Sequence, residues 1–204
     1  MVLREDLEKA VRILKRGGVI AYPTETVYGL GSDIHRPSAI EKIFELKDRP
    51  QQSALIVLIP HPSFLKDLAA EISPLAQMLI DRFWPGPLTL LFNALPSVSS
   101  LITGGSRKVG IRISPDPDCM ALMALWNRPL ISTSANPSGQ PPATCVSEIK
   151  TYFSDRLEGI LDGGSRNFSE PSSVLDCSGP APALIREGAI PKTDLETVAG
   201  IIND

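Results

Sequence analysis

The sequence predicts a single-domain α/β protein whose sheet mixes parallel and antiparallel strands. Stretches of helical periodicity alternate with short apolar runs along the chain, which is the pattern of α/β folds. Several apolar runs follow one another with no helix between them, and this favours a mixed sheet over a purely parallel one. A length of 204 residues is that of one domain, which we assign to residues 1–204.

The N-terminal part begins with a helix that carries apolar residues at helical spacing and ends at Gly17-Gly18. A strand is expected at 19–22, followed by a loop at 23–32 that is rich in Thr and Gly. Pro37 suits the first turn of the next helix. The continuous apolar run 54–59 predicts a central strand of the sheet.

The rest of the chain continues the alternation. Residues 97–106 are small and polar, so a mobile loop is expected there. The remaining expected helices are 62–70, 73–84, 119–126, 146–153 and 192–202. The remaining expected strands are 88–92, 108–113, 129–132, 159–162, 173–177 and 183–186. The expected helix 73–84 has to end at Trp84-Pro85-Gly86-Pro87, because prolines and glycine break a helix.

The composition argues against several classes of protein. A net charge of −3 does not suit a protein whose whole surface coats nucleic acid or an anionic membrane. No run reaches the ~18 consecutive apolar residues of a membrane-spanning helix. The N-terminus carries acidic residues in place of an apolar signal core. We therefore expect a cytoplasmic protein with no membrane partner.

Cysteines, histidines and motifs narrow the chemistry further. Cys119, Cys145 and Cys177 are widely spaced and form no CxxC pair, so free thiols are expected in place of disulfides or a zinc site. His35 and His61 are too few for a histidine-rich metal cage. The chain lacks the GxGxxG, GxxxxGK(S/T), GxSxG and HExxH motifs, which argues against a dinucleotide fold, a P-loop, a serine hydrolase and a zinc protease.

Two polar segments are candidates for a site. Ser132-Thr133-Ser134-Ala135-Asn136 lies at the end of the strand at 129–132, and ligands of open α/β sheets bind outside the carboxyl ends of strands. Its hydroxyl and amide groups suit phosphate, carboxylate or bicarbonate. The segment 23–31 is either a strand-ending turn or a loop whose hydroxyls orient a polar substrate.

Lys47 and Arg49 lie at the exit of the helix that begins near Pro37. Such a pair is most often a solvated helix end. Here Arg49 precedes Pro50, which holds its backbone extended, and arginine can bind phosphate or carboxylate through two parallel hydrogen bonds. A site for small anions is therefore weighed against a solvated helix end, with both cations expected outside the core.

Three further positions keep two interpretations each. Arg112 lies within an apolar strand and either faces solvent or points into a polar cleft, which Lys108 on the same face would also enter. Arg186 is either a further site cation or half of a surface ion pair with Glu187. Ser172 belongs either to a strand-edge hydroxyl pair or to an ordinary turn.

Cations and hydroxyls together bind anions and stabilise negative charge that develops during a reaction. This set of residues suits phosphoryl or nucleotidyl transfer, in which positioning and charge neutralisation outweigh covalent chemistry. With a nucleotide we expect Mg²⁺ held mainly by phosphates and water, with no metal site in the protein and no tightly bound organic cofactor.

Five motifs occur in order along the chain. They are Tyr22-Pro23-Thr24-Glu25-Thr26-Val27-Tyr28-Gly29-Leu30-Gly31, Lys47-x-Arg49-Pro50, Trp84-Pro85-Gly86-Pro87-Leu88-Thr89, Gly110-Ile111-Arg112 and Ser132-Thr133-Ser134-Ala135-Asn136. In this order they resemble the YrdC family of threonylcarbamoyl-AMP synthases. The resemblance runs from about residue 7 to about residue 190.

The resemblance implies a twisted mixed sheet with flanking helices around a large basic cavity. It implies that L-threonine, bicarbonate or CO2, and ATP with Mg²⁺ are converted to threonylcarbamoyl-adenylate and pyrophosphate. A downstream tRNA threonylcarbamoyl transferase complex would then modify an adenosine next to the anticodon, and weak RNA binding is possible.

The resemblance also implies roles by position. Catalytic contacts to the phosphates and the bicarbonate-derived group fall on Lys47, Arg49, Ser134 and Asn136. Threonine contacts fall on Thr24, Arg112, Ser132 and Ser172, with Arg112 at the carboxylate. Further ATP contacts fall on Lys108 and Arg186.

The chain departs from the long form of the family in two respects. Its strand at 54–59 has no histidine, and it ends at Asp204 without a further C-terminal domain, so a short form is expected. Two alternatives remain: a paralogue that adenylates a different carbamate, and a module that binds double-stranded RNA or tRNA through the same basic cleft.

Overall fold

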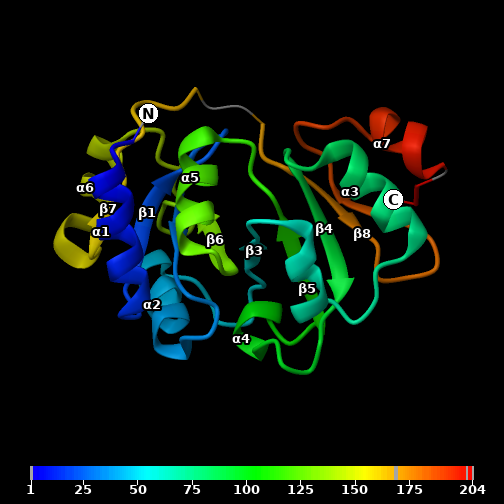
Figure 1. The fold of residues 1–204 in the computed structure, drawn as a ribbon, viewed down its shortest axis with the longest axis horizontal. Coiled ribbons are helices and arrows are strands. Elements are labelled where there is room, and N and C mark those ends of the chain that lie inside the picture. The colour runs from blue at the N-terminus through cyan, green and yellow to red at the C-terminus, as the bar shows by residue number, and fades with distance from the viewer. Residues whose placement is uncertain (1, 168–169, 201, 204) are drawn as a thin grey trace.

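The computed structural model describes residues 2–167, 170–200 and 202–203. Within them, one sheet runs through the molecule in the strand order β7-β1-β2-β6-β3-β5-β4-β8-β9 (Figure 1). Its strands are β1 (Ile20–Pro23), β2 (Tyr28–Gly31), β3 (Ile56–Leu58), β4 (Leu88–Asn93), β5 (Lys108–Arg112), β6 (Leu130–Ser134), β7 (Gly159–Ile160), β8 (Ser173–Asp176) and β9 (Ala183–Arg186). The helices are α1 (Arg4–Lys15), α2 (Pro37–Lys47), α3 (Pro74–Phe83), α4 (Ser100–Thr103), α5 (Pro117–Trp126), α6 (Val146–Phe153) and α7 (Lys192–Ala199), with 3-10 turns η1 (Pro62–Asp67) and η2 (Ser154–Arg156).

The strand pairing confirms the predicted mixed sheet. β1 and β7, β3 and β5, and β4 and β8 pair parallel. The pairs β1–β2, β2–β6, β3–β6, β4–β5 and β8–β9 are antiparallel. β3 occupies the middle of the order, as the apolar run 54–59 predicts for a strand buried on both faces.

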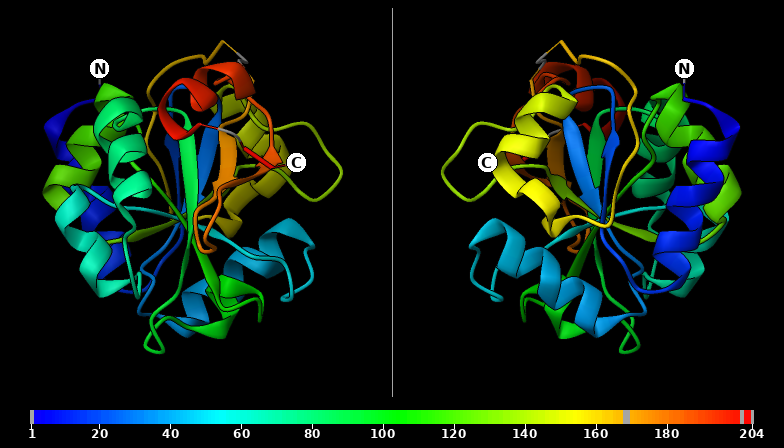
Figure 2. Two further views of the ribbon diagram at one scale, coloured as in Figure 1. Left: turned by 90° about the vertical axis from the view of Figure 1, so that its right-hand side faces the viewer. Right: turned by 90° about the vertical axis from the view of Figure 1, so that its left-hand side faces the viewer.

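Helices cover both faces of the sheet. α1 and α5 lie side by side on one face, and Leu14 and Leu122 belong to the apolar cluster between them and the sheet. α6 lies on the opposite face (Figure 2). Its Phe153 belongs to the larger cluster, which also takes in α2, α3 and α7. A cavity lies at the edge of this core, where several strands end.

Two predicted loops contain regular structure. β2 lies inside the expected loop 23–32, with Tyr28 and Leu30 fully buried. The pattern is hard to recognise because glycines, which are poor strand formers, alternate with the two apolar residues. The expected mobile loop 97–106 contains α4, and its Ile102 is buried and accepts a hydrogen bond from the Leu55 backbone N–H at 2.8 Å.

Other boundaries differ by a few residues. The expected helix 62–70 is the shorter 3-10 turn η1, and the expected helix 192–202 ends as α7 at Ala199. Residue 201 of that expected helix lies outside the described residues. Within the described part, no helix is long and apolar enough to cross a membrane.

The cysteines are free thiols, as predicted. Cys119 and Cys177 are buried, and burial raises the pKa of each thiol to about 12. Neither is therefore poised as a thiolate nucleophile near neutral pH.

Candidate active site

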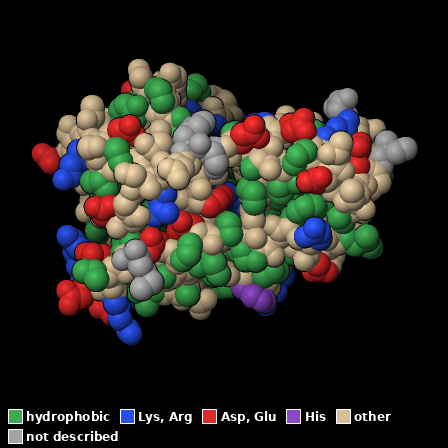
Figure 3. Space-filling view, turned by 90° about the horizontal axis from the view of Figure 1, so that it is seen from above, with side chains coloured by type: hydrophobic (Ala, Val, Ile, Leu, Met, Phe, Trp, Pro, Cys, Tyr) green, Lys and Arg blue, Asp and Glu red, His purple; other side chains and the backbone are tan. Residues whose placement is uncertain are grey.

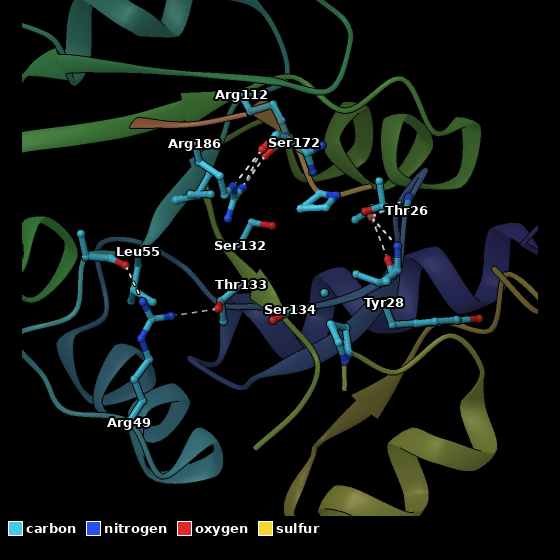
Figure 4. Close-up of a pocket in the computed structure, with 17 residues that line it drawn as sticks. Thr26, Tyr28, Arg49, Leu55, Arg112, Ser132, Thr133, Ser134, Ser172 and Arg186 are labelled. Atoms are coloured by element: carbon cyan, nitrogen blue, oxygen red, sulfur yellow. Dashed lines mark hydrogen bonds between the residues drawn. The ribbon is translucent and has the colours of Figure 1, made fainter. Parts of the chain in front are cut away.

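A cavity of about 450 Å³ opens where several strands end. Its walls come from the turn between β1 and β2, the start of β3, the ends of β5, β6 and β9, and the residues just before β8. Figure 4 shows Arg112 and Arg186 beside Ser172 on one side of the cavity. Arg49 lies on the other side, and the hydroxyl residues of β6 lie between. The volume is within the range of small-molecule pockets.

Most of the residues singled out in the sequence meet at this cavity. Those that line it are Thr24, Arg49, Arg112, Ser132, Ser134, Ser172 and Arg186. Lys47 and Asn136 lie directly behind the wall, since both bond to Ser134, and Lys108 lies apart from it. None of the described residues in the wall is acidic, so the charge that faces a ligand is positive.

The end of β6 places three consecutive hydroxyl residues in the wall of the cavity. Ser132, Thr133 and Ser134 are the last residues of the strand, which pairs with β3 on one side and β2 on the other. Because side chains alternate along a strand, Ser132 and Ser134 share one face. The segment 132–136 was predicted at the end of the strand at 129–132; its three hydroxyl residues belong to β6, and Ala135 and Asn136 follow the strand.

Arg49 is fixed by the end of α2. Asp48 has a left-handed backbone with φ 48°, and the Arg49 backbone N–H donates to the Phe44 carbonyl at 3.0 Å. The guanidinium donates to the Thr133 hydroxyl at 3.4 Å and to the Ala54 carbonyl at 3.1 Å. Partial burial lowers the pKa of Arg49, yet arginine stays protonated at any physiological pH. Arg49 therefore presents a permanent, oriented charge to the cavity.

Lys47 is buried, whereas the sequence predicted a position outside the core. The residue is 3% exposed, and its ammonium donates to the Ser134 carbonyl, to the Asn136 carbonyl at 2.8 Å and to Asn136 Oδ1 at 3.2 Å. An ammonium has three protons, so all of them are used within the protein. Burial, followed by the charge of Arg49, lowers the pKa of Lys47 to about 8. Lys47 is thus a buried residue whose hydrogen bonds stabilise the 134–136 turn.

The side chain of Asn136 also stabilises this turn through hydrogen bonds. Its Oδ1 accepts from the Ser134 hydroxyl at 2.6 Å, and its Nδ2 donates to the Gln140 carbonyl at 2.6 Å. Ser134 is consequently held at its carbonyl by Lys47 and at its hydroxyl by Asn136. The side chain of Ser134 remains the part of this group that reaches the cavity wall.

Arg112 points into the polar cleft, which settles the two interpretations left by the sequence. It is 7% exposed and pairs with the Glu25 carboxylate, whose other oxygen accepts from the Ser114 hydroxyl at 2.6 Å. A buried cation needs such a partner. Glu25 and Ser114 were not among the predicted site residues. The signal for Glu25 was present, because it is the one acid in the first motif.

Arg186 lines the cavity and does not pair with Glu187. Its Nη2 donates to the Ser172 carbonyl at 2.7 Å and to the Ser172 hydroxyl at 3.2 Å. Ser172 also exchanges a hydrogen bond with the Thr89 hydroxyl at 3.1 Å. Burial and then the nearby charge of Arg112 lower the pKa of Arg186. Two cations held this close together favour an anion between or beside them.

Lys108 does not enter the cavity with Arg112. Both lie on one face of β5, but they occupy its opposite ends, about 13 Å apart at ~3.3 Å per residue. Lys108 instead donates to Asp176 at 2.6 Å. Burial alone would raise the pKa of Asp176, and the hydrogen bonds from Lys108 and Ser178 outweigh it and lower that pKa.

The chemistry available is that of an anion site. Guanidinium groups bind carboxylate and phosphate, and the hydroxyls can donate to their oxygens. Within the described residues, no group of three or more His, Cys, Asp or Glu side chains is placed to hold a metal ion.

Comparison with known proteins gives matches over nearly the whole chain. The Sua5/YciO/YrdC family model, which bears the description telomere recombination, matches residues 12–188. A threonylcarbamoyl-AMP synthase of Pyrococcus abyssi is 38% identical over 205 residues, which cover 98% of this chain and 60% of the relative. One of Photobacterium profundum is 33% identical over 186 residues, which cover 90% of this chain and all of the relative.

A solved structure agrees with these matches. Pyrococcus abyssi Sua5 complexed with L-threonine superposes with a TM-score of 0.92 at 38% identity, over 97% of this chain and 58% of that one. The chain therefore spans 60% of one Pyrococcus relative and the full length of the Photobacterium one.

Proposed function

Because the chain belongs to the Sua5/YciO/YrdC family, we propose that it is a threonylcarbamoyl-AMP synthase, a nucleotidyltransferase. In the proposed reaction the amine of L-threonine is carboxylated by bicarbonate or CO2. An oxygen of the resulting carbamate attacks the α-phosphate of ATP, and the bond from this phosphorus to the bridging oxygen of the β-phosphate breaks. The products are threonylcarbamoyl-adenylate and pyrophosphate, with water when bicarbonate is the carbon source.

The observation that carries the proposal is one cavity with arginines on two sides and hydroxyls between them. The substrates bring anionic groups at both ends of the reacting pair: the carboxylate of threonine and the phosphates of ATP. The carbamate between them is also anionic. Anionic substrates repel one another. Cations that face both ends of the reacting pair offset this repulsion and hold the substrates close together.

On this proposal threonine lies on the side of Arg112. Its carboxylate would face Arg112, and its polar groups would meet the hydroxyls of Thr24, Ser132 and Ser172. Glu25 keeps the Arg112 guanidinium in place without taking part in the cavity wall. Fixed donors of this kind bind the substrate in one orientation, which presents its amine to the carbon source.

The phosphates would lie toward the guanidinium groups of Arg49 and Arg186 and beside Ser134, whose hydroxyl proton is donated to Asn136 Oδ1. Charge that develops on the transferring phosphoryl group would meet donors already in position. Lys47 and Asn136 act on this step by holding Ser134. The donor set of guanidinium and hydroxyl groups suits anions, so Mg²⁺ would be held by phosphates and water and would neutralise charge on the triphosphate.

The product is a mixed anhydride, and such a product is used promptly. We propose that a downstream tRNA threonylcarbamoyl transferase complex receives it and transfers the threonylcarbamoyl group to an adenosine next to the anticodon.

Release of pyrophosphate from ATP and Mg²⁺ tests the proposal. The assay is run with bicarbonate plus L-threonine, then without each, and then with serine in place of threonine. Release that requires both bicarbonate and threonine is the expected result. Release with bicarbonate and another amine would make the protein a paralogue for a different carbamate. No release, with salt-sensitive binding of RNA, would favour the RNA-binding alternative.

A further inference from the structure

Tyr22 is a fully buried tyrosine directly behind the cavity, and the steps above do not use it. It lies on β1, and its phenol Oη donates to the Ser132 hydroxyl at 2.7 Å. Ser132 lies two strands away on β6 and lines the cavity. A buried phenol needs a hydrogen-bond partner, and Ser132 is the partner that Tyr22 has.

Two glycines make this reach possible. In the pairing of β1 with β2, Tyr22 lies opposite Gly29 and Ile20 lies opposite Gly31. A Cβ at Gly29 would lie 3.2 Å from Tyr22 Cζ, and a Cβ at Gly31 would lie 2.8 Å from Tyr22 Cε1. The ring therefore lies across the bare backbone of β2 on its way to β6. Any side chain at Gly31 would displace it.

The contact determines what the Ser132 hydroxyl can do. Since Tyr22 donates, Ser132 is the acceptor in this bond and keeps its own proton. Among the described residues, no hydrogen bond donated by Ser132 Oγ to a protein acceptor is found. Burial raises the pKa of Tyr22 well above its ordinary value, so the phenol stays a donor across the working pH range. The free proton of Ser132 is available to an acceptor oxygen in the cavity.

We propose that Tyr22 is a positioning residue that fixes the Ser132 hydroxyl as a hydrogen-bond donor to a carboxylate oxygen of the bound amino acid. The inference rests on the proposed function, and it adds the buried layer that orients the amino-acid subsite. Gly31 belongs to this layer, because it lets the ring of Tyr22 lie where its phenol reaches Ser132.

A double-mutant cycle tests the inference. Tyr22→Phe removes only the phenol oxygen and is expected to raise KM for L-threonine about threefold to tenfold, the effect of one hydrogen bond, with KM for ATP unchanged within about twofold. Ser132→Ala raises KM for threonine at least as much. The double variant is expected to match Ser132→Ala alone, because Tyr22 acts through that hydroxyl. Tyr152→Phe, on α6, is the matched control for loss of a phenol.

A second variant tests the same contact from the neighbouring strand β2. Gly31→Ala keeps both hydroxyls, displaces the ring of Tyr22 and does not line the cavity, so it should also raise KM for threonine more than KM for ATP. Effects of Tyr22→Phe and Ser132→Ala that multiply in the double variant would overturn the inference, as would an unchanged KM in Tyr22→Phe. A wild-type protein that neither binds nor turns over threonine would instead overturn the proposed function, and the inference with it.

Discussion

Glu25 is the counter-ion that lets Arg112 remain buried at the edge of the cavity, and its replacement by Gln gives a quantitative test. One oxygen of the Glu25 carboxylate accepts from Arg112, and the other accepts from the Ser114 hydroxyl at 2.6 Å. The two charged side chains are 17% and 8% exposed. Glu25→Gln preserves the shape of the side chain and removes its charge.

The size of the effect follows from this burial. Breaking a buried ion pair by removing one partner costs about 3–5 kcal/mol. Glu25 is partly exposed, and glutamine keeps one acceptor oxygen, so we expect the free energy of unfolding to fall by about 2 kcal/mol. For a chain of this length that is a decrease in Tm of about 4–8 °C.

Urea unfolding followed by circular dichroism measures this change directly. Glu8→Gln is the matched control, because Glu8 pairs with Arg4 on the surface, where the side chains are 44% and 85% exposed. An exposed pair on a helix contributes only about 0.3–0.5 kcal/mol. Saturating L-threonine should raise the Tm of Glu25→Gln more than that of the wild type, since its carboxylate would replace the missing charge. Equal losses in the two variants would refute the reasoning.

Three further predictions test other parts of the site. Gly188→Ala places a Cβ 2.1 Å from a backbone oxygen of the segment that walls the cavity, so kcat/KM should fall at least about tenfold, while Gly179→Ala, with its nearest contact at 3.7 Å, serves as the control. Lys108→Ala should change KM for ATP less than about twofold, whereas Arg186→Ala should raise it about tenfold or more, as steady-state kinetics would measure. The folded-state pKa of Lys47, about 8, lies below its ordinary value of 10.5. The folded protein therefore binds fewer protons than the unfolded chain between these pH values, and the contribution of Lys47 to stability rises with pH from about 8 to about 10.5. Urea titrations of Lys47→Arg across this range should lack that rise; an identical rise would place the titration elsewhere.

Local patterns predicted most of the fold because most elements carry their own signal. The helix before Gly17 and the strand at 54–59 each have a period or an apolar run that needs no tertiary information. β2 carries no such signal. Its glycines are needed by the ring of Tyr22 on the neighbouring strand, and that requirement appears only once β1 and β2 are paired.

The same limit applies to the site. Sequence reasoning found Arg49 and Lys47 together, but a spacing of two residues could not show which of them faces the cavity. The αL backbone of Asp48 turns the chain between them, so that Arg49 reaches the wall while Lys47 is buried. Lys108 was grouped with Arg112 by strand alternation, which gives the face of a residue and not its place along the strand.

The motifs that appear as separate strings in the sequence form one set of contacts in the structure. From the first motif, Tyr22 bonds to Ser132 and Glu25 pairs with Arg112. From the second, Lys47 holds Ser134. Ser132, Arg112 and Ser134 thus each have a partner from a distant part of the chain, which fixes their position before any ligand arrives. Donors fixed in this way do not have to reorganise when charge develops, and this is the main advantage of a folded site over the same groups in water. It follows that substitutions in the first motif act through residues of the others, so their effects should be non-additive with Ser132 and Arg112 variants and additive with Lys108 variants.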